Sequence, residues 1–392
     1  MNKELGLKVL GQIMGWDNDQ ARVEFRWLSF MSAYKYDGYH GYLVGARFLE
    51  SLVTWLQQFE KKEERKIAYA FIKENLIYFN HSEIERLIEK FYPDTVKEEL
   101  IACVSNCLGI KRHAIWSEEK NIQKYCWEKR KTLFMGLSDG ARLDVFRRIN
   151  ANVISNEQVV ISTQTDMQKW ASLLKDLRSD LKKIEDVDTG GEKFSRVYLI
   201  DDFTASGTSL LPDPKHTGVL KGKLYRFGQS LKEMSGQLGE DSPFEENFKI
   251  IVHHYIGTEK AKKNIDRVYG ENEDKFKQLS INNICFKYGM LLKSDIVIDE
   301  SSGHPITALC KKYYDKGLEG DGKHGMQSGV KNKMVGYANC GLPVVLEHNT
   351  PNNSLALLWA DTTRSGSEKP IRPLFRRRER HSDIEVPQEL DG

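Results

Sequence analysis

Two adjacent acidic residues, Asp201 and Asp202, close a run of four apolar residues at positions 197–200. An apolar run of this length, followed by a change to polar residues, predicts a buried strand. Carboxylate oxygens at a strand end can accept hydrogen bonds from the two hydroxyls of a ribose. The residue types at this position therefore suit the binding of a sugar.

Small and hydroxyl-bearing residues follow the two acids and suit the phosphate of a phosphosugar. These residues are Ala205, Ser206, Gly207, Thr208 and Ser209. We expect a helix to begin near Ser206, so that the backbone N–H groups of this run and the positive end of the helix dipole hold the anion. Gly207 would let the backbone approach the phosphate closely. The alternative is a strand, a turn and a helix with a fortuitous acidic end.

The whole segment 197–210 resembles the signature of the type I phosphoribosyltransferases, which bind phosphoribosyl pyrophosphate (PRPP). In that family two acids end a hydrophobic strand, and a loop ending in a Thr-Gly-x-Thr-like run follows. The resemblance implies that Asp201 and Asp202 are catalytic residues holding the ribose, and that the run from Ala205 to Ser209 binds the 5′-phosphate. Ala205 departs from the purine-using members, in which an acid at the matching position assists the base.

A glycine-containing turn at 136–142 lies upstream of the signature, after a short strand expected at 131–135. The resemblance implies a loop that grips the pyrophosphate of PRPP, and this turn is the segment that can do so. Its candidate ligand-binding residues are Gly136, Ser138, Asp139, Gly140 and Arg142. Asp139 suits a helix cap or magnesium-bound water better than a direct anion contact. The alternative is an ordinary surface turn before a basic helix face.

Amide side chains are concentrated in a turn near the C-terminal end, His-Asn-Thr-Pro-Asn-Asn at 348–353. Asn349 and Asn352 offer both donors and acceptors, as reading the edge of a nucleobase requires. The alternative is the local hydrogen bonding of a turn, which Pro351 favours. With an N-terminal helical region, this ending resembles a bacterial group of phosphoribosyltransferase-like proteins associated with phage-defence gene clusters.

The resemblance implies a reaction in which a nucleophile displaces pyrophosphate from C1 of PRPP, with Mg²⁺ offsetting the pyrophosphate charge. The sequence identifies neither metal ligands nor the acceptor. Three functions stay open. The chain is a toxic phosphoribosyltransferase-like effector of antiphage defence, a catalytically inactive sensor of PRPP or a nucleotide, or a module that binds a partner, such as a reverse transcriptase with its nucleic acid.

Composition sets further bounds on the function. The 58 Lys and Arg nearly balance the 56 Asp and Glu, so no overall field favours nucleic acid. Six cysteines occur without a C-x-x-C pair, which argues against zinc and a disulfide framework and favours a reducing cytoplasm. No apolar run approaches the length of a membrane span, so we expect no membrane association.

Hydrophobic periodicity and composition predict three regions in the 392 residues. Residues 1–111 are expected to form an all-helical N-terminal domain, because apolar side chains recur there at helical spacing. Residues 112–362 are expected to form an α/β domain with a parallel sheet of phosphoribosyltransferase type and flanking helices. Residues 363–392 carry an arginine cluster and are expected to form a basic, flexible tail.

The elements around the signature would place its residues at one edge of that sheet. We expect strands at 158–162 and 248–255, and a helix at 166–184 between the first of them and the signature strand. His253 and His254 lie at the carboxyl end of a predicted strand, where open parallel sheets bind ligands. Because adjacent side chains alternate in direction, we expect at most one of them to face a ligand.

Overall fold

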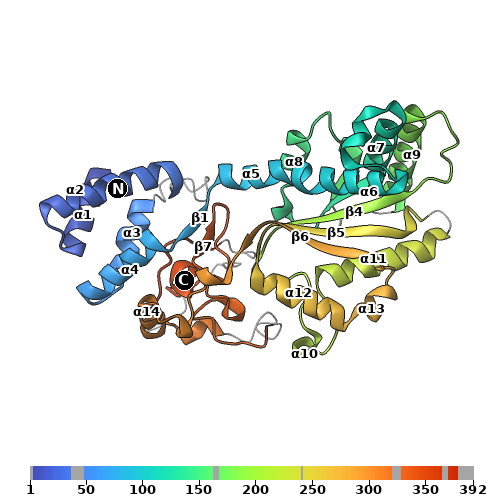
Figure 1. Cartoon of the computed structure of the whole chain (residues 1–392). Helices are drawn as coiled ribbons and strands as arrows, with labels where there is room; N and C mark the ends of the chain where they lie inside the picture. Colours follow the sequence, from blue (N-terminus) through green and yellow to red (C-terminus); the bar gives the residue numbers. More distant parts are fainter. Residues whose placement is uncertain are drawn as a thin grey trace, which may run out of the picture. The chain divides into compact units, whose positions relative to one another are not determined.

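The computed structural model describes six stretches of the chain, which form two compact units (Figure 1). The central unit runs from Ser82 to Asp295. The terminal unit combines the residues before Ser82 with those from Ile296 onward, apart from 328 and 329. The described stretches are 3–36, 48–161, 167–239, 242–319, 328–363 and 370–377.

The central unit is built on a parallel sheet of five strands in the order β3-β2-β4-β5-β6. This arrangement confirms the expected α/β fold with a parallel sheet and flanking helices. Parallel strands need crossover connections, and helices separate each successive pair along the chain. The strands are β2 (Thr132–Gly136), β3 (Val159–Ile161), β4 (Phe194–Thr204), β5 (Phe244–Thr258) and β6 (Ile284–Leu292).

One face of the sheet packs against three long helices, because alternate residues of β4 point toward them. Val197 and Leu199 of β4 are fully buried in this core together with Ile265. The helices are α9 (Met167–Ile184), α11 (Lys223–Leu238) and α12 (Glu259–Glu271). Burial on both faces explains why the strand is continuously apolar in sequence rather than alternating.

The opposite face packs against aromatic residues from α5 (His81–Phe91) and α8 (Leu143–Ile149). The Phe91 ring lies 5.5 Å from that of Tyr198 on β4, measured between centroids. It lies 5.2 Å from the ring of Phe146 on α8. The central unit therefore includes α5 and α6 (Glu98–Leu108), although the sequence suggested a boundary near residue 111. Their apolar faces complete the cover of the sheet.

The terminal unit joins the two ends of the chain around a second, smaller sheet. Its strands β1 (Ile77–Phe79) and β7 (Val344–Leu346) are parallel. The Trp55 indole N–H donates to the backbone oxygen of Leu357 at 2.7 Å, which ties an N-terminal helix to the C-terminal segment. The expected N-terminal helices are present as α1 (Lys3–Met14), α2 (Asn18–Met31), α3 (Phe48–Gln57) and α4 (Lys62–Glu74). The C-terminal segment adds α14 (Ile306–Tyr313) and α16 (Ala356–Trp359).

Part of the segment expected to be a flexible tail is packed into the terminal unit. Leu374 and Phe375 are 3% and 2% exposed. Their backbone N–H groups both donate to the oxygen of Leu358, at 3.1 and 2.9 Å. The apolar residues among the arginines therefore belong to a core. The stretches 364–369 and 378–392, which hold the rest of that tail, lie outside the described residues.

Candidate functional site

Two loops meet at the carboxyl edge of β2 and β4, since these strands are parallel neighbours. The upstream loop, residues 136–142, follows β2, and the downstream loop, residues 205–209, follows β4. The Ser138 hydroxyl donates a hydrogen bond to Asp201, 63 positions away. A Cβ atom on Gly140 would lie 2.5 Å from a carboxylate oxygen of Asp202, so the loop backbone lies against that acid. The fold thus brings together the two segments that the sequence proposed separately.

Asp201 is buried and already has two hydrogen-bond donors. Its side chain is 2% exposed. One oxygen accepts from Ser138, and the other accepts from the ammonium of Lys223, the first residue of α11. A buried carboxylate is tolerated only when it is paired in this way. Nothing local in the sequence indicated the pairing with Lys223, because the two residues are 22 positions apart.

Asp202 points away from Asp201, toward the opposite face of the sheet. Its side chain is partly buried, and it accepts a hydrogen bond from the backbone N–H of Phe203 at 2.8 Å. On the same side, the hydroxyl of Tyr255 donates to the backbone oxygen of Ala141 at 3.2 Å, which holds the upstream loop near Asp202. The two acids are neighbours in sequence but face different surroundings.

The helix expected to begin near Ser206 does not form. Residues 205–211 are bends and turns, with one helix-like bond from the Leu211 N–H to the Gly207 oxygen at 2.9 Å. Pro212 ends the turn because proline has no N–H to continue the ladder and disfavours helix in the residue before it. The next helix, α10 (Pro214–Thr217), has four residues, and the next long helix, α11, begins at Lys223. The downstream loop therefore has no long helix of its own to supply a dipole.

Contacts with the start of α12 fix the downstream loop from one side. The Thr258 hydroxyl donates to the Ala205 oxygen at 2.6 Å, and the Asn264 amide donates to the Ser206 oxygen at 3.0 Å. Gly207 has a φ of +78°, and a Cβ there would lie 2.8 Å from Ile265. The glycine is thus required by the packing of the loop against α12, whatever its role toward a ligand.

The polar groups of the downstream loop are only partly used inside the protein. The Ser206 and Thr208 hydroxyls lie 2.9 Å apart, and the Thr208 N–H donates to the Ser206 hydroxyl at 3.4 Å. None of the described residues accepts a hydrogen bond from the backbone N–H of Ser206, Gly207 or Ser209. Neighbouring backbone N–H groups without internal acceptors are suited to an anion.

The two histidines of β5 have opposite surroundings. His254 lies beside Asp201 in the strand register and is 1% exposed. Burial, helped by the Lys223 charge and opposed by the charges of Asp201 and Asp202, lowers the pKa of His254 to about 4. His253 packs against Phe91, with 4.2 Å between ring centroids, and burial lowers its pKa to about 3. Only His254 is on the Asp201 side, and both imidazoles are neutral at pH 7.

The end of the upstream loop is conformationally unusual. Arg142 adopts the left-handed conformation, with a φ of 46° and a ψ of 47°, at the start of α8. Such backbone is uncommon for a residue other than glycine and is often found in binding loops. Asp139, in the single turn before it, is exposed. The pyrophosphate-binding role assigned to this loop stays a prediction.

Asn349 and Asn352 belong to the terminal unit. The Leu346 N–H donates to the Asn349 oxygen at 3.1 Å, and the Tyr337 N–H donates to the Asn352 oxygen at 2.6 Å. Both backbones therefore stabilise the local turns. The proposed reading of a nucleobase by their side chains stays a prediction.

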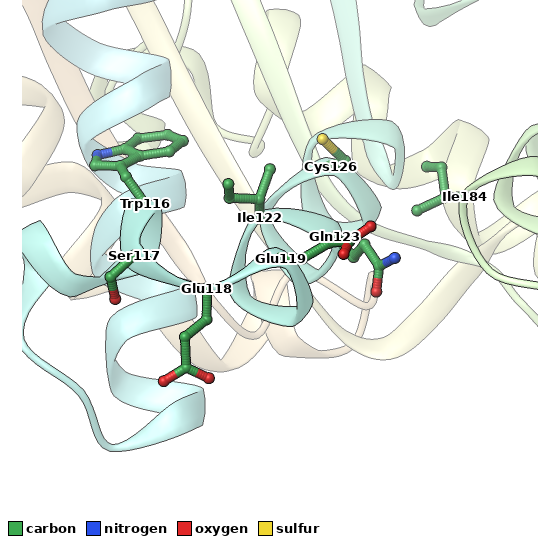
Figure 2. Close-up of a pocket in the computed structure, with 8 residues that line it drawn as sticks. All are labelled: Trp116, Ser117, Glu118, Glu119, Ile122, Gln123, Cys126 and Ile184. Carbon is green, nitrogen blue, oxygen red and sulfur yellow. The ribbon is translucent and has the colours of Figure 1, made fainter.

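A hollow of about 430 Å³ on the central unit lies apart from these residues (Figure 2). Two apolar side chains in it, Trp116 and Ile122, are 45% and 39% exposed. None of the predicted site residues lines it. Its lining residues are Trp116, Ser117, Glu118, Glu119, Ile122, Gln123, Cys126 and Ile184.

The described stretches of the chain contain no cluster of three or more His, Cys, Asp or Glu side chains able to hold a metal ion. They also contain no helix both long and apolar enough to cross a membrane.

Comparison with known proteins identifies the family. Residues 52–377 match the family model PRTase-CE, a phosphoribosyltransferase-like family. No curated protein and no solved structure matches the chain. The matched range includes both loops, the two acids and the amide-rich turn. Since the match covers most of the sequence, the chain belongs to the PRTase-CE family.

Proposed function

We propose that the central unit binds PRPP or a related nucleotide phosphosugar at the carboxyl edge of its sheet. The observation that carries this proposal is the meeting of the two loops at the ends of β2 and β4, seen in the hydrogen bond from Ser138 to Asp201 and in the approach of Gly140 to Asp202. Open parallel sheets bind ligands at this edge. Membership of a phosphoribosyltransferase-like family supports the choice of ligand.

Each part of the edge suits one part of such a ligand. The N–H groups of Ser206, Gly207 and Ser209, which have no acceptor among the described residues, suit the 5′-phosphate, and the upstream loop suits the pyrophosphate. Of the two acids, Asp202 is the better acceptor for a ribose hydroxyl, since its side chain is partly exposed whereas that of Asp201 is buried. Mg²⁺, when bound with the pyrophosphate, would offset its charge.

Ala205 bears on the reaction. Its side chain is a methyl group, and the residue is 3% exposed, so no acid at this position can assist a base. Displacement of pyrophosphate through a cationic sugar depends mainly on positioning and shielding, which the loops can supply. We therefore expect any acceptor to be a nucleophile that needs no general base from this position.

The test is calorimetric titration of the protein with PRPP and Mg²⁺. Asp202→Asn should weaken PRPP binding about tenfold or more, a loss of about 1.4 kcal/mol, because a charged acceptor for the ribose is replaced by an amide. Asp274→Asn is the matched control, since it removes the same charge from a side chain that is 96% exposed. Unchanged affinity in the Asp202 variant removes the ribose assignment, and absent binding to the wild-type protein overturns the proposed function.

A second assay tests whether the bound ligand is turned over. Pyrophosphate release from PRPP with a panel of bases, nucleotides and RNA distinguishes a transferase from a sensor that binds without turnover.

We propose a role as a toxic effector of antiphage defence in a reducing cytoplasm, which rests on the sequence resemblance. Expression should then arrest growth, and Asp202→Asn should relieve the arrest. Toxicity of the variant that persists at equal expression would contradict a role of this site in the arrest. Co-purification of a reverse transcriptase or nucleic acid would favour the partner-binding module.

A further inference from the structure

Lys223 connects the two ends of the segment that carries the proposed site. Its backbone N–H donates to the oxygen of Ser209, the last residue of the downstream loop, at 3.2 Å. Its ammonium returns to Asp201, at the end of β4 and before that loop. The side chain of Lys223 therefore spans the loop from its last residue back to the strand.

The turn that precedes Lys223 holds the lysine in place. Gly222 has a φ of +107°, and a Cβ there would lie 2.4 Å from the oxygen of Leu210. The next residue, Leu224, is fully buried and donates its backbone N–H to the same oxygen at 3.2 Å. The backbone at the base of the Lys223 side chain is therefore fixed, and the contact with Asp201 restrains the ammonium at its other end. Less side-chain entropy is then lost when the ammonium binds a ligand.

The charge of Lys223 can favour a bound anion where the expected helix dipole is absent. The downstream loop has N–H groups suited to a phosphate but no helix dipole at Ser206 to favour a negative charge. An ammonium has three donors, and within the described part of the chain Asp201 is the one side chain that accepts from Lys223. The lysine side chain is 20% exposed, compared with 2% for Asp201, so its remaining donors are closer to solvent than the carboxylate is.

We infer that Lys223 is the phosphate-binding cation of the downstream loop and that Asp201 is its positioning residue rather than a ribose ligand. This inference rests on the proposed function, because it names the group that recognises the 5′-phosphate of the same ligand. A compact ammonium suits a phosphate as a point charge. The buried Asp201 fixes the direction of that charge, and Ser138 fixes Asp201.

A double-mutant cycle of Asp201 and Lys223 separates this role from simple charge neutralisation. Asp201→Asn alone keeps the lysine, so it should weaken ribose 5-phosphate binding only a few-fold. Lys223→Met alone leaves Asp201 buried without its cation and is expected to lower stability. Asp201→Asn combined with Lys223→Met removes both charges, so the pair becomes neutral and the fold should recover. We expect the double variant to bind ribose 5-phosphate at least about tenfold more weakly than the wild type, because a charge-assisted contact is lost. Lys223→Arg, which keeps the charge, should stay within a few-fold of the wild type.

The control lysine is Lys249, which also pairs with a single carboxylate, that of Glu99, in the central unit. Lys249→Met should leave ribose 5-phosphate binding unchanged. If the double variant binds as tightly as the wild type, Lys223 serves only as the counter-ion of Asp201 and the inference is wrong. If the wild type binds neither ribose 5-phosphate nor PRPP, the proposed function fails before the inference is reached.

A measurement on the unmodified protein makes the test independent of how the variants fold. An amine-reactive acylating reagent, read out by peptide mass spectrometry, reports the accessibility of each lysine. Ribose 5-phosphate should slow the acylation of Lys223 and leave Lys249 unaffected. Equal rates with and without ribose 5-phosphate, at a concentration that saturates the protein, would overturn the inference.

Discussion

Each edge of the central sheet carries a lysine in an ion pair, and the two lysines are paired differently. At the amino edge, Lys131 donates to Glu192 and to Glu245, both at 2.6 Å. At the carboxyl edge, Lys223 donates to Asp201. The Lys131 side chain is 9% exposed and that of Lys223 is 20% exposed. The amino edge has two anions for one cation, whereas the carboxyl edge pairs one with one.

The partners of Lys131 make it a connection between strands. Lys131 precedes β2, Glu192 precedes β4, and Glu245 lies at the start of β5. Burial lowers the pKa of Lys131, but hydrogen bonds to the two carboxylates outweigh burial, so the pKa is raised overall. This lysine stays charged and holds three strands together. The comparison shows that the two carboxylates at the amino edge use the lysine charge to join strands. At the carboxyl edge a lysine with one carboxylate and greater exposure suits the anion-binding role inferred for Lys223.

The largest expected effect on stability is at the amino edge. Lys131→Met should lower the free energy of unfolding by about 3 kcal/mol, because two carboxylates lose their shared cation and repel one another. PRPP affinity should not change, since the substitution is at the opposite end of the strands. Urea denaturation and calorimetric titration measure the two quantities. A loss below about 1 kcal/mol, or a weakened affinity, would break the distinction between the edges.

The second effect is a dependence of stability on pH, arising from His253 near the carboxyl edge. Its folded-state pKa of about 3 lies below its ordinary value of 6.5, so the unfolded chain binds a proton first as the pH falls. Stability should therefore decrease below pH 6.5, by about 2 kcal/mol at about pH 5. The nearby titratable groups His254, Asp201 and Lys223 are the same in the wild type and in a His253 variant, so their contributions cancel to a first approximation.

His253→Leu is the variant that isolates this contribution. Both imidazole nitrogens of His253 are buried without hydrogen-bond partners among the described residues, so leucine removes an unsatisfied group as well as a titratable one. The variant should be at least as stable as the wild type at pH 7 and should lose less stability on acidification. Urea midpoints at a series of pH values measure this. Identical slopes for both proteins would assign the pH dependence to other groups.

Apolar runs and turn residues in the sequence predicted the strands and turns that form from neighbouring residues. The apolar run before Asp201 predicted a buried strand, and the glycine at position 136 and the residues after it predicted the turn at 136–142. The helix expected at Ser206 failed because Pro212, six residues later, leaves room for only one turn. That signal was present in the sequence and outweighs the hydroxyl residues that suggested a helix start.

Contacts between distant residues could not be predicted in this way. Lys223 reaches Asp201 only because the chain folds back after an irregular segment, and no periodicity encodes that return. The pairing of β1 with β7 joins the two ends of the chain into one unit, which the expected division into successive domains did not anticipate. The opposite directions of Asp201 and Asp202, by contrast, follow from strand geometry alone.

The smallest expected effect comes from serine-to-alanine substitutions near the two ends of β4, one in the upstream loop beside Asp201 and one at the start of the strand. Ser138→Ala removes one of the two donors to Asp201 and should cost about 1 kcal/mol of stability, because the bond is made to a buried charge. Ser195→Ala, near the amino edge, removes only a 3.4 Å contact with Glu128 and should change stability by less than about 0.5 kcal/mol. Ser138→Ala should also weaken ribose 5-phosphate binding a few-fold, since Asp201 then holds Lys223 less firmly. If the two substitutions have equal effects on stability and binding, the hydrogen bond from Ser138 to Asp201 contributes no more than a surface contact.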